Sequence, residues 1–419
     1  MIGAGIFALL GEAGAIAGSG VYLSFIAGGV IAMLSAYSLG KLGARYPAAG
    51  GIVEYLVQCF GPGWFTGTVS IMLYLSASVA LSLIAKTFGS YGFSLLPGTA
   101  PEFLKDVLAV AVVVFFVLVN LAGAKDVALI ERVLVGAKFL VLVILAVAGI
   151  AYLKPALVAP STYPPAAAIF NSVAVTFFAF EGFRVITNTA EDMENPARTL
   201  PRAMFTAIVL VLGLYVAVSF AVFGSLPVDR VIATKDYALA EAAKPAFGAI
   251  GFTIVAITAL VSTASSINAN LYAVTNVTYQ MAKDGELPKP FGKPIGHSRE
   301  GLVISGILII VLALLLDLTE IAVLGSISIL MVHGLVHLGH LRKHKETGAN
   351  PGVLIAALLA SLVSIALAVS FVIRHTPKII YLLVVFLVVS GGLEWLLQRI
   401  SGREITARTP QSEPSNTDA

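Results

Sequence analysis

Charged residues are scarce in this sequence, and their scarcity argues against a soluble protein. Asp, Glu, Lys and Arg make up 12% of the 419 residues, about half of the roughly 25% found in soluble domains. Apolar residues make up 58%, and the mean hydropathy is +0.94. A net charge of only +3 argues against a nucleic-acid partner, and the single cysteine, Cys59, excludes a disulfide within the chain. The composition predicts a protein whose solvent is a lipid bilayer.

Motifs that signal catalysis or nucleotide binding are also missing. The sequence has no P-loop, no zinc-ligand motif with a general base and no nucleophile elbow. These absences argue against an enzyme and against an ATP-driven pump, and they predict neither a cofactor nor a metal. No basic stretch precedes Met1–Leu10, so no signal peptide is expected.

Long apolar segments fill most of the chain. A helix needs about 20 apolar residues to cross the hydrocarbon core of a membrane. Met1–Leu10 is apolar but too short to cross alone. Eleven longer segments qualify, three of them bounded by charges at Glu12 and Lys41, Glu54 and Lys86, and Asp106 and Lys125, and the others at Val133–Tyr152, Pro155–Thr189, Ala203–Val228, Pro245–Ala282, Gly301–Leu316, Ile321–Leu341, Thr347–Ile373 and Ile379–Leu397.

Basic residues gather in alternate loops, which predicts an orientation. Loops on the cytoplasmic side of membrane proteins carry an excess of Lys and Arg. If the loop with Lys41 and Arg45 is cytoplasmic, most of the basic residues in the loops between the segments lie on the cytoplasmic side, and so does the C-terminus. We therefore predict a multi-pass protein of the cell membrane with a cytoplasmic C-terminus. Residues 401–419 are rich in Ser, Thr and Pro, and we expect a disordered tail there.

Two glycine-containing stretches predict interrupted helices. Gly3-Ala4-Gly5-Ile6-Phe7 opens the chain, and Phe177–Phe183 lies near the middle of the sixth segment counted from it. Interrupted helix within a membrane is tolerated where it faces protein or a wet cavity, and the free N–H and C=O groups of half-helices suit a small zwitterion. The alternative is that these glycines only let helices pack closely.

Lys138 is the most isolated charge in the hydrophobic segments. About ten apolar residues lie on either side of it, and a charge at the centre of a membrane costs about 2.5–3.5 kcal/mol on insertion scales. A functional role is therefore favoured over snorkelling to the surface. The polar run Ser262–Asn268 in the eighth segment offers partners for it, although hydrogen bonding between helices would also explain that run.

Two further polar patterns lie in the segments. Glu181 and Arg184 are spaced i, i+3 and can pair with each other. His333, His337, His340 and His344 form a stripe along one helix face. Such a stripe can bind a metal or relay protons, but without a neighbouring carboxylate or cysteine we favour a polar face that packs against a neighbouring helix and runs out to the cytoplasmic surface.

Five short motifs, in order along the chain, give the sequence a resemblance to a known family. Two resemble the interruptions of the first and sixth helices, and three resemble the loop after the second helix, the loop after the sixth and the end of the eighth. The sequence resembles the amino acid–polyamine–organocation superfamily of transporters through Gly3–Phe7, Phe177–Gly182, Tyr46–Gly51, Glu191–Pro201 and Met281–Pro288.

The resemblance implies an all-α integral membrane protein with the leucine-transporter-type fold. That fold has two five-helix repeats of inverted topology followed by two peripheral helices. It implies a ten-helix transport core over residues 1–342, two peripheral helices over 343–400 and the tail over 401–419. The family begins with the inner half of the first helix, which does not precede Gly3 here, so eleven of the twelve helices are expected to be complete.

The resemblance also implies a substrate site. Amide groups around Gly3, Ala4 and Gly5 would hold the carboxylate of an amino acid, and carbonyls of Phe178, Ala179 and Glu181 would hold its amino group. Lys138 resembles a fifth-helix lysine that takes the place of a coupling ion, with Ser265 and Ser266 on the eighth-helix side of that site.

These features lead to a functional hypothesis with alternatives. We predict a secondary active transporter that works by alternating access, with protons as the coupling ion and neutral amino acids as substrates. The alternatives are an amino acid exchanger on the same fold and a non-transporting, amino-acid-binding membrane sensor. Neither the identity of the amino acid nor the oligomeric state can be predicted from these patterns.

Overall fold

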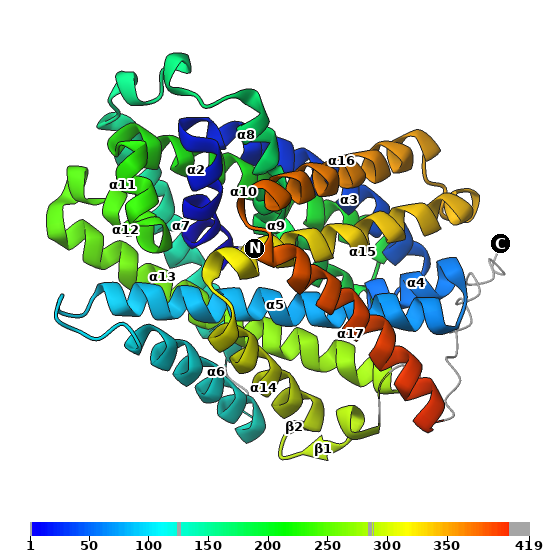
Figure 1. Cartoon of the computed structure of the whole chain (residues 1–419). Helices are drawn as coiled ribbons and strands as arrows, with labels where there is room; N and C mark the ends of the chain where they lie inside the picture. The colour runs from blue at the N-terminus through cyan, green and yellow to red at the C-terminus, as the bar shows by residue number, and fades with distance from the viewer. Residues whose placement is uncertain (1, 124–126, 284–286, 288, 402–419) are drawn as a thin grey trace.

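The computed structural model describes residues 2–123, 127–283, 287 and 289–401, and nearly all of them are helical (Figure 1). The α-helices are α1 (Ala4–Phe7), α2 (Leu9–Ala17), α3 (Val21–Arg45), α4 (Ile52–Phe60), α5 (Trp64–Ser94), α6 (Leu104–Ala122), α7 (Val127–Ala151), α8 (Ala166–Asn171), α9 (Val173–Phe180), α10 (Pro196–Ser225), α11 (Val228–Ala233), α12 (Ala238–Ala242), α13 (Lys244–Lys283), α14 (Glu300–Leu315), α15 (Leu318–Thr347), α16 (Pro351–His375) and α17 (Lys378–Ser401). Two short antiparallel strands, β1 (Pro294–Ile295) and β2 (Ser298–Arg299), form a hairpin.

Among the described residues, ten helical stretches are long and apolar enough to cross a membrane. The predicted segment Gly301–Leu316 corresponds to α14, which has 16 residues and is shorter than these. The remaining predicted segments each match one long stretch, except at the start of the chain. The predicted multi-pass, all-α architecture is therefore confirmed.

The beginning of the chain differs from the prediction. We expected one apolar segment between Glu12 and Lys41. Instead, α1 and α2 follow each other almost without a break and end at Ala17, and α3 starts at Val21. The division lies at Gly18, whose φ is +52°, a left-handed conformation that glycine adopts without steric cost. Glu12 thus lies within α2, whereas the long helix of the predicted second segment, α3, begins only at Val21.

The sixth predicted segment changes its helix type halfway. After α8 and α9, the chain continues as η4 (Glu181–Asp192), a 3₁₀ helix of 12 residues. A 3₁₀ stretch this long is unusual and often marks a functional hinge. The predicted interruption at Phe177–Phe183 is therefore a change from α to 3₁₀ geometry between Phe180 and Glu181.

The two glycine-containing stretches lie next to each other in the middle of the bundle. α1 and α2 pack against α9, while α5 packs against α13 and α15. In Figure 1, α5 runs from the loop after α4 to the loop that leads into α6. α16 packs along α15 and α3, and α17 packs mainly against α5. The predicted domain boundary after residue 342 falls within the last turns of α15, and the predicted tail lies outside the described residues except for Ser401.

Helix α15 defines two ends of the molecule. Its first turn carries Thr319, which contacts Lys235, and its last turns carry Glu346, which contacts Arg45. We call these the Lys235 end and the Arg45 end. At about 1.5 Å per residue, the 30 residues of α15 span about 45 Å, and His333 lies near the midpoint.

Candidate functional site

A cavity of about 90 Å³ lies where the two glycine-containing stretches meet. Five parts of the chain line it: the start of α1, the start of α2, the middle of α5, the junction of α9 and η4, and the middle of α13. Seven of the residues that the sequence predicted for substrate or ion binding are among its walls. These are Gly3, Ala4, Gly5, Phe178, Ala179, Glu181 and Ser266.

Two glycines allow these segments to approach so closely. A Cβ atom on Gly5 would lie 2.6 Å from the carbonyl oxygen of Ala179 and 2.8 Å from the hydroxyl of Tyr215. A Cβ atom on Gly3 would lie 2.3 Å from Oγ of Ser266. Side chains at these two positions would push α1 away from α9 and α13. Gly3 and Gly5 therefore set the width of the cavity. They allow close packing of helices and also line the cavity, so both interpretations of the first glycine-containing stretch apply.

The cavity presents backbone groups of both signs. The first N–H groups of a helix have no acceptor within that helix, and at the start of α1 they belong to residues that line the cavity, Ala4 and Gly5. On the opposite wall, the helix changes from α to 3₁₀ geometry, so the carbonyl oxygens from Phe178 onward accept hydrogen bonds from N–H groups three residues ahead instead of four. The carbonyl oxygen of Ala179 accepts a hydrogen bond from the Tyr215 hydroxyl at 3.3 Å, so one of its two lone pairs is already used. Such a pair of walls suits a zwitterion.

Glu181 and Arg184 form the charged part of the cavity wall. Nε of Arg184 donates to Oε1 of Glu181 at 2.5 Å, and both side chains are at most 10% exposed. The predicted i, i+3 pair is therefore confirmed. Arg184 itself lines the cavity, as does Asn270 on α13. Sequence reasoning placed neither of them at the site, although Asn270 closely follows the polar run Ser262–Asn268.

A second, smaller cavity continues from the first toward the Arg45 end. It shares Ala80, Arg184 and Asn270 with the first cavity, and it extends along α5 to Tyr74 and along α13 to Val277. Arg184 and Asn270 therefore stand between the two cavities. A shift of these two side chains would join the cavities into one path toward the Arg45 end.

An ionic contact between the buried Glu12 and the partly exposed Lys235 lies at the Lys235 end. Nζ of Lys235 lies 3.0 Å from Oε1 of Glu12. The hydroxyl of Thr319 donates a hydrogen bond to the carboxylate of Glu12 at 2.9 Å. The contact connects three parts of the chain. Glu12 belongs to α2, Lys235 lies just after α11, and Thr319 belongs to α15. On its far side lies a vestibule of about 410 Å³, to which Lys235 and Thr319 also contribute. Glu12 is three residues beyond Leu9, a cavity residue, so about one helical turn separates the vestibule from the cavity.

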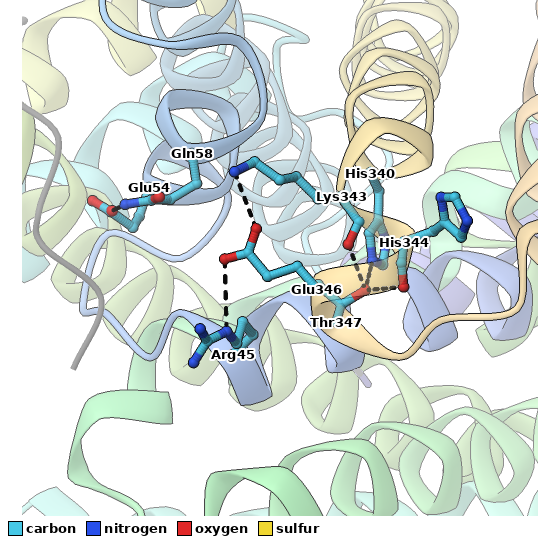
Figure 2. Close-up of polar contacts among 8 residues, drawn as sticks. All are labelled: Arg45, Glu54, Gln58, His340, Lys343, His344, Glu346 and Thr347. Carbon is cyan, nitrogen blue, oxygen red and sulfur yellow. Dashed lines mark hydrogen bonds and ion pairs between the residues drawn. The ribbon is translucent and has the colours of Figure 1, made fainter. Parts of the chain in front are cut away.

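The Arg45 end carries a looser polar network, shown in Figure 2. The carboxylate of Glu346 lies between Arg45, at 3.7 Å, and Lys343, at 3.1 Å. About a third of each of these side chains is exposed. Thr347 bonds to Nε2 of His340 at 2.8 Å. Exposed pairs of this kind contribute little to stability.

The residues predicted for ion coupling are only partly brought to the cavity. Ser266 lines it, but Ser265 and Lys138 are not among the described residues that do. Lys138 is 6% exposed and lies on α7, which packs against α10 and against α13, the helix that carries both serines.

The histidine stripe packs against a neighbouring helix, as predicted. His333, His337 and His340 are fully buried. Hydroxyl groups of α3 hold two of them, because Ser35 lies 3.1 Å from Nε2 of His337 and Ser38 lies 2.9 Å from Nδ1 of His340. His333 contacts a different neighbour, Glu181, which the sequence pattern did not predict.

Comparisons with known proteins point in the same direction. The model of a family described as amino acid permease matches residues 1–390. An uncharacterized protein of Methanocaldococcus jannaschii is 34% identical over 412 residues, which cover 98% of this chain and 93% of that protein. The inner membrane transport protein YbaT of Escherichia coli is 34% identical over 367 residues, which cover 87% of this chain and 85% of YbaT. The serine/threonine exchanger SteT of Bacillus subtilis is 24% identical over 308 residues, which cover 71% of this chain and 68% of SteT.

The family match covers most of the chain, and it agrees with the motifs and with the helices that cross the membrane. The likeness extends to both glycine-containing stretches, since both lie within residues 1–390. This chain belongs to the amino acid permease family and is thus a multi-pass secondary transporter of amino acids, not an enzyme.

Proposed function

We propose that this protein is a proton-coupled symporter that carries neutral amino acids through the cavity at α1, α5, α9 and α13 by alternating access. One observation carries the proposal: the start of α1 and the junction of α9 and η4 meet at a cavity that has the contact of Glu12 and Lys235 at one end and is followed by a second cavity at the other. Such an arrangement favours a binding site that opens to each side in turn over a continuous pore.

The backbone groups of the cavity assign an orientation to the substrate. Its carboxylate binds the amide groups of Gly3, Ala4 and Gly5, where the positive end of the helix dipole favours an anion. Its ammonium group binds the carbonyl oxygens on the opposite wall. These belong to Phe178, Ala179 and Glu181.

A neutral substrate side chain is supported by the charge balance of the cavity. Glu181 is neutralised by Arg184, so the wall carries no net charge from this pair. The remaining lining includes the apolar side chains of Leu9, Leu83 and Ile84. A substrate with a charged side chain would have to lose water without gaining a free partner, which is costly.

Proton coupling is assigned to Lys138, with Ser265 and Ser266 on the facing helix. A buried ammonium group is disfavoured relative to its neutral form, so Lys138 can release and regain a proton as access alternates. The burial of Lys138 and the packing of α7 against α13 support this assignment.

The Arg45 end is proposed to face the cytoplasm, with the protein in the cell membrane. Basic residues cluster there on α3 and on the last turns of α15, including Lys41, Arg342 and Lys345, as the excess of Lys and Arg in cytoplasmic loops would require. Around the vestibule at the Lys235 end, acidic residues such as Glu102 and Asp317 accompany the lysines. The C-terminus, which follows α17, would then be cytoplasmic.

Uptake into proteoliposomes tests the proposed function. A mixture of labelled neutral amino acids is offered with and without an inward proton gradient, and with and without unlabelled amino acid inside. We expect the gradient to stimulate uptake into empty liposomes and Lys138→Ala to lose that stimulation. Uptake that requires internal amino acid and ignores the gradient would instead identify an exchanger, an alternative that the likeness to a serine/threonine exchanger supports.

A further inference from the structure

His333 occupies an unusual position between the cavity and the Arg45 end. It is fully buried near the midpoint of α15, and its Nε2 lies 3.4 Å from Oε2 of Glu181. Glu181 in turn lines the cavity. On the other side, the ring centroid of His333 lies 6.0 Å from that of His337. The imidazole therefore links a cavity carboxylate to the histidine stripe.

Hydrogen-bonding atoms without partners are concentrated at this link. Among the described residues, Oε2 of Glu181, both ring nitrogens of His333 and Nδ1 of His337 are buried and lack a hydrogen-bond partner. Buried polar groups are normally paired, so each unpaired one calls for an explanation. The next histidine along the stripe, His340, has partners for both nitrogens, Ser38 and Thr347.

An added proton can strengthen this contact. When the neutral imidazole of His333 carries its hydrogen on Nδ1, protonation of Nε2 makes that atom a donor to Oε2 of Glu181, across a distance of 3.4 Å that must shorten by about 0.5 Å to reach the range of a charge-assisted hydrogen bond. The other neutral tautomer, with its hydrogen on Nε2, donates to Oε2 without an added proton. Arg184 already holds the other oxygen, Oε1. The carboxylate is thus shared between a permanent cation and a titratable one.

Charged, titratable and aromatic groups approach His333 from several elements. η4 contributes Glu181 and Arg184, α9 contributes the ring of Phe177 at 5.5 Å, and α15 contributes His337. Other elements that pack against α15 carry further titratable groups. Several have partners: Glu12 with Lys235, Glu54 with Gln58, Lys86 with Asp106, Glu394 with Gln398, Tyr74 with Ser305 and Tyr91 with the carbonyl of Phe7. Tyr55 on α4 is buried, and its hydroxyl lacks a hydrogen-bond partner, while α3 contributes Lys41 and Arg45 at the Arg45 end. Arg184 balances the charge of Glu181.

We propose that Glu181 and His333 form a second proton-binding site, which senses the substrate through Glu181. A proton binds to Nε2 of His333 and is shared with Oε2 of Glu181, and the proton already on Nδ1 leaves in its place toward His337 and the Arg45 end, so that His333 returns to a neutral form. The inference rests on the proposed function, since it adds a second protonatable group to the one assigned to Lys138. Because linkage is reciprocal, a site that touches the cavity wall makes the affinity for the amino acid depend on pH.

The dependence of substrate affinity on pH tests this site. The dissociation constant of the purified full-length protein for a transported neutral amino acid is measured from pH 5 to pH 8. One linked proton changes the affinity by up to tenfold per pH unit. We expect a steep segment in the parent and a loss of that segment in His333→Gln. His375→Gln is the matched control, because His375 is an exposed histidine that stacks on Phe371.

A second measurement separates this inference from the proposed function. The ratio of uptake with and without the proton gradient is compared among the parent, Lys138→Ala and His333→Gln. A parent stimulated by the gradient, with His333→Gln keeping both its stimulation and its pH profile, overturns the second site but leaves symport intact. A parent that ignores the gradient overturns the symport and the second site with it. If His333→Gln does not reach the membrane, Glu181→Gln carries the same test, with the same flattened pH profile expected.

Discussion

A single methyl group on Gly5 is the sharpest perturbation of the cavity that the structure offers. In Gly5→Ala, the new Cβ would lie 2.6 Å from the carbonyl oxygen of Ala179, whereas ordinary contacts begin at 3.4 Å. The carbonyl oxygen of Ala179 is a backbone atom and cannot move by a side-chain rotation. The hydroxyl of Tyr215, 2.8 Å from the new Cβ, donates a hydrogen bond to the same carbonyl oxygen. The walls of the cavity must therefore separate by about 0.8 Å, the difference between 2.6 and 3.4 Å.

The cost of this separation can be estimated. Overpacking a tightly packed interior costs about 1 to 3 kcal/mol, and each 1.4 kcal/mol corresponds to about tenfold in affinity. If the two walls hold the two charged groups of one amino acid, the separation weakens binding by about 5- to 140-fold. The same strain also lowers the thermal stability of the unliganded protein.

Equilibrium binding of a labelled neutral amino acid to purified protein, with parallel thermal melts, measures both effects. Gly213→Ala is the matched control, because it adds the same methyl group to a membrane helix, α10, where no atom lies within 4 Å. We expect the control to match the parent in affinity and stability. Gly5→Ala with the affinity of the parent would refute the idea that the substrate bridges α1 and α9.

Three further predictions concern the ends of the molecule. Glu12→Gln weakens the contact that closes the Lys235 end by about 1 kcal/mol. A cysteine introduced by Leu9→Cys should therefore be alkylated about fivefold faster when Glu12→Gln is also present. An unchanged alkylation rate would show that this contact does not close the cavity. Glu346→Gln should change transport and melting temperature by less than the equivalent of about 1 kcal/mol, since its partners are exposed, and a large loss would contradict that reading. Burial of Glu241 opposes its ionisation, but Lys244 and Arg230 together outweigh this effect and lower the pKa of Glu241. The stabilising effect of Glu241 is therefore present above its unfolded pKa of about 4.5 and is lost as the pH falls further. Melts of Glu241→Gln should lose less stability than the parent on acidification, and an equal loss would contradict the assignment.

Much of the architecture could be predicted because it depends on local composition. Uninterrupted apolar segments located nearly every membrane helix, since the length needed to cross a bilayer is a property of one stretch of chain. The glycine-containing stretches located the cavity, because close approach of backbones needs residues without side chains, as Gly3 and Gly5 show. The division at Gly18 was missed, although the sequence Gly18-Ser19-Gly20 carried the signal of a turn.

The rest of the site depends on contacts between distant parts of the chain. Glu181 and His333 are 152 positions apart, and no local pattern in either segment indicates that they meet. Arg184 was recognised as a partner of Glu181 because the two are close in sequence, but its position at both cavities follows from the packing of η4 against α10, α3 and α13. Asn270 was overlooked for the same reason.

The central claim is that an amino acid and a proton cross the membrane together, and their joint flux tests it most directly. Proteoliposomes that contain a pH-sensitive dye and have no initial pH gradient are given a neutral amino acid outside, with the membrane potential clamped. The account predicts that the interior acidifies as the amino acid enters, and that Lys138→Ala abolishes the acidification. Entry of the amino acid into empty liposomes without any acidification would contradict it.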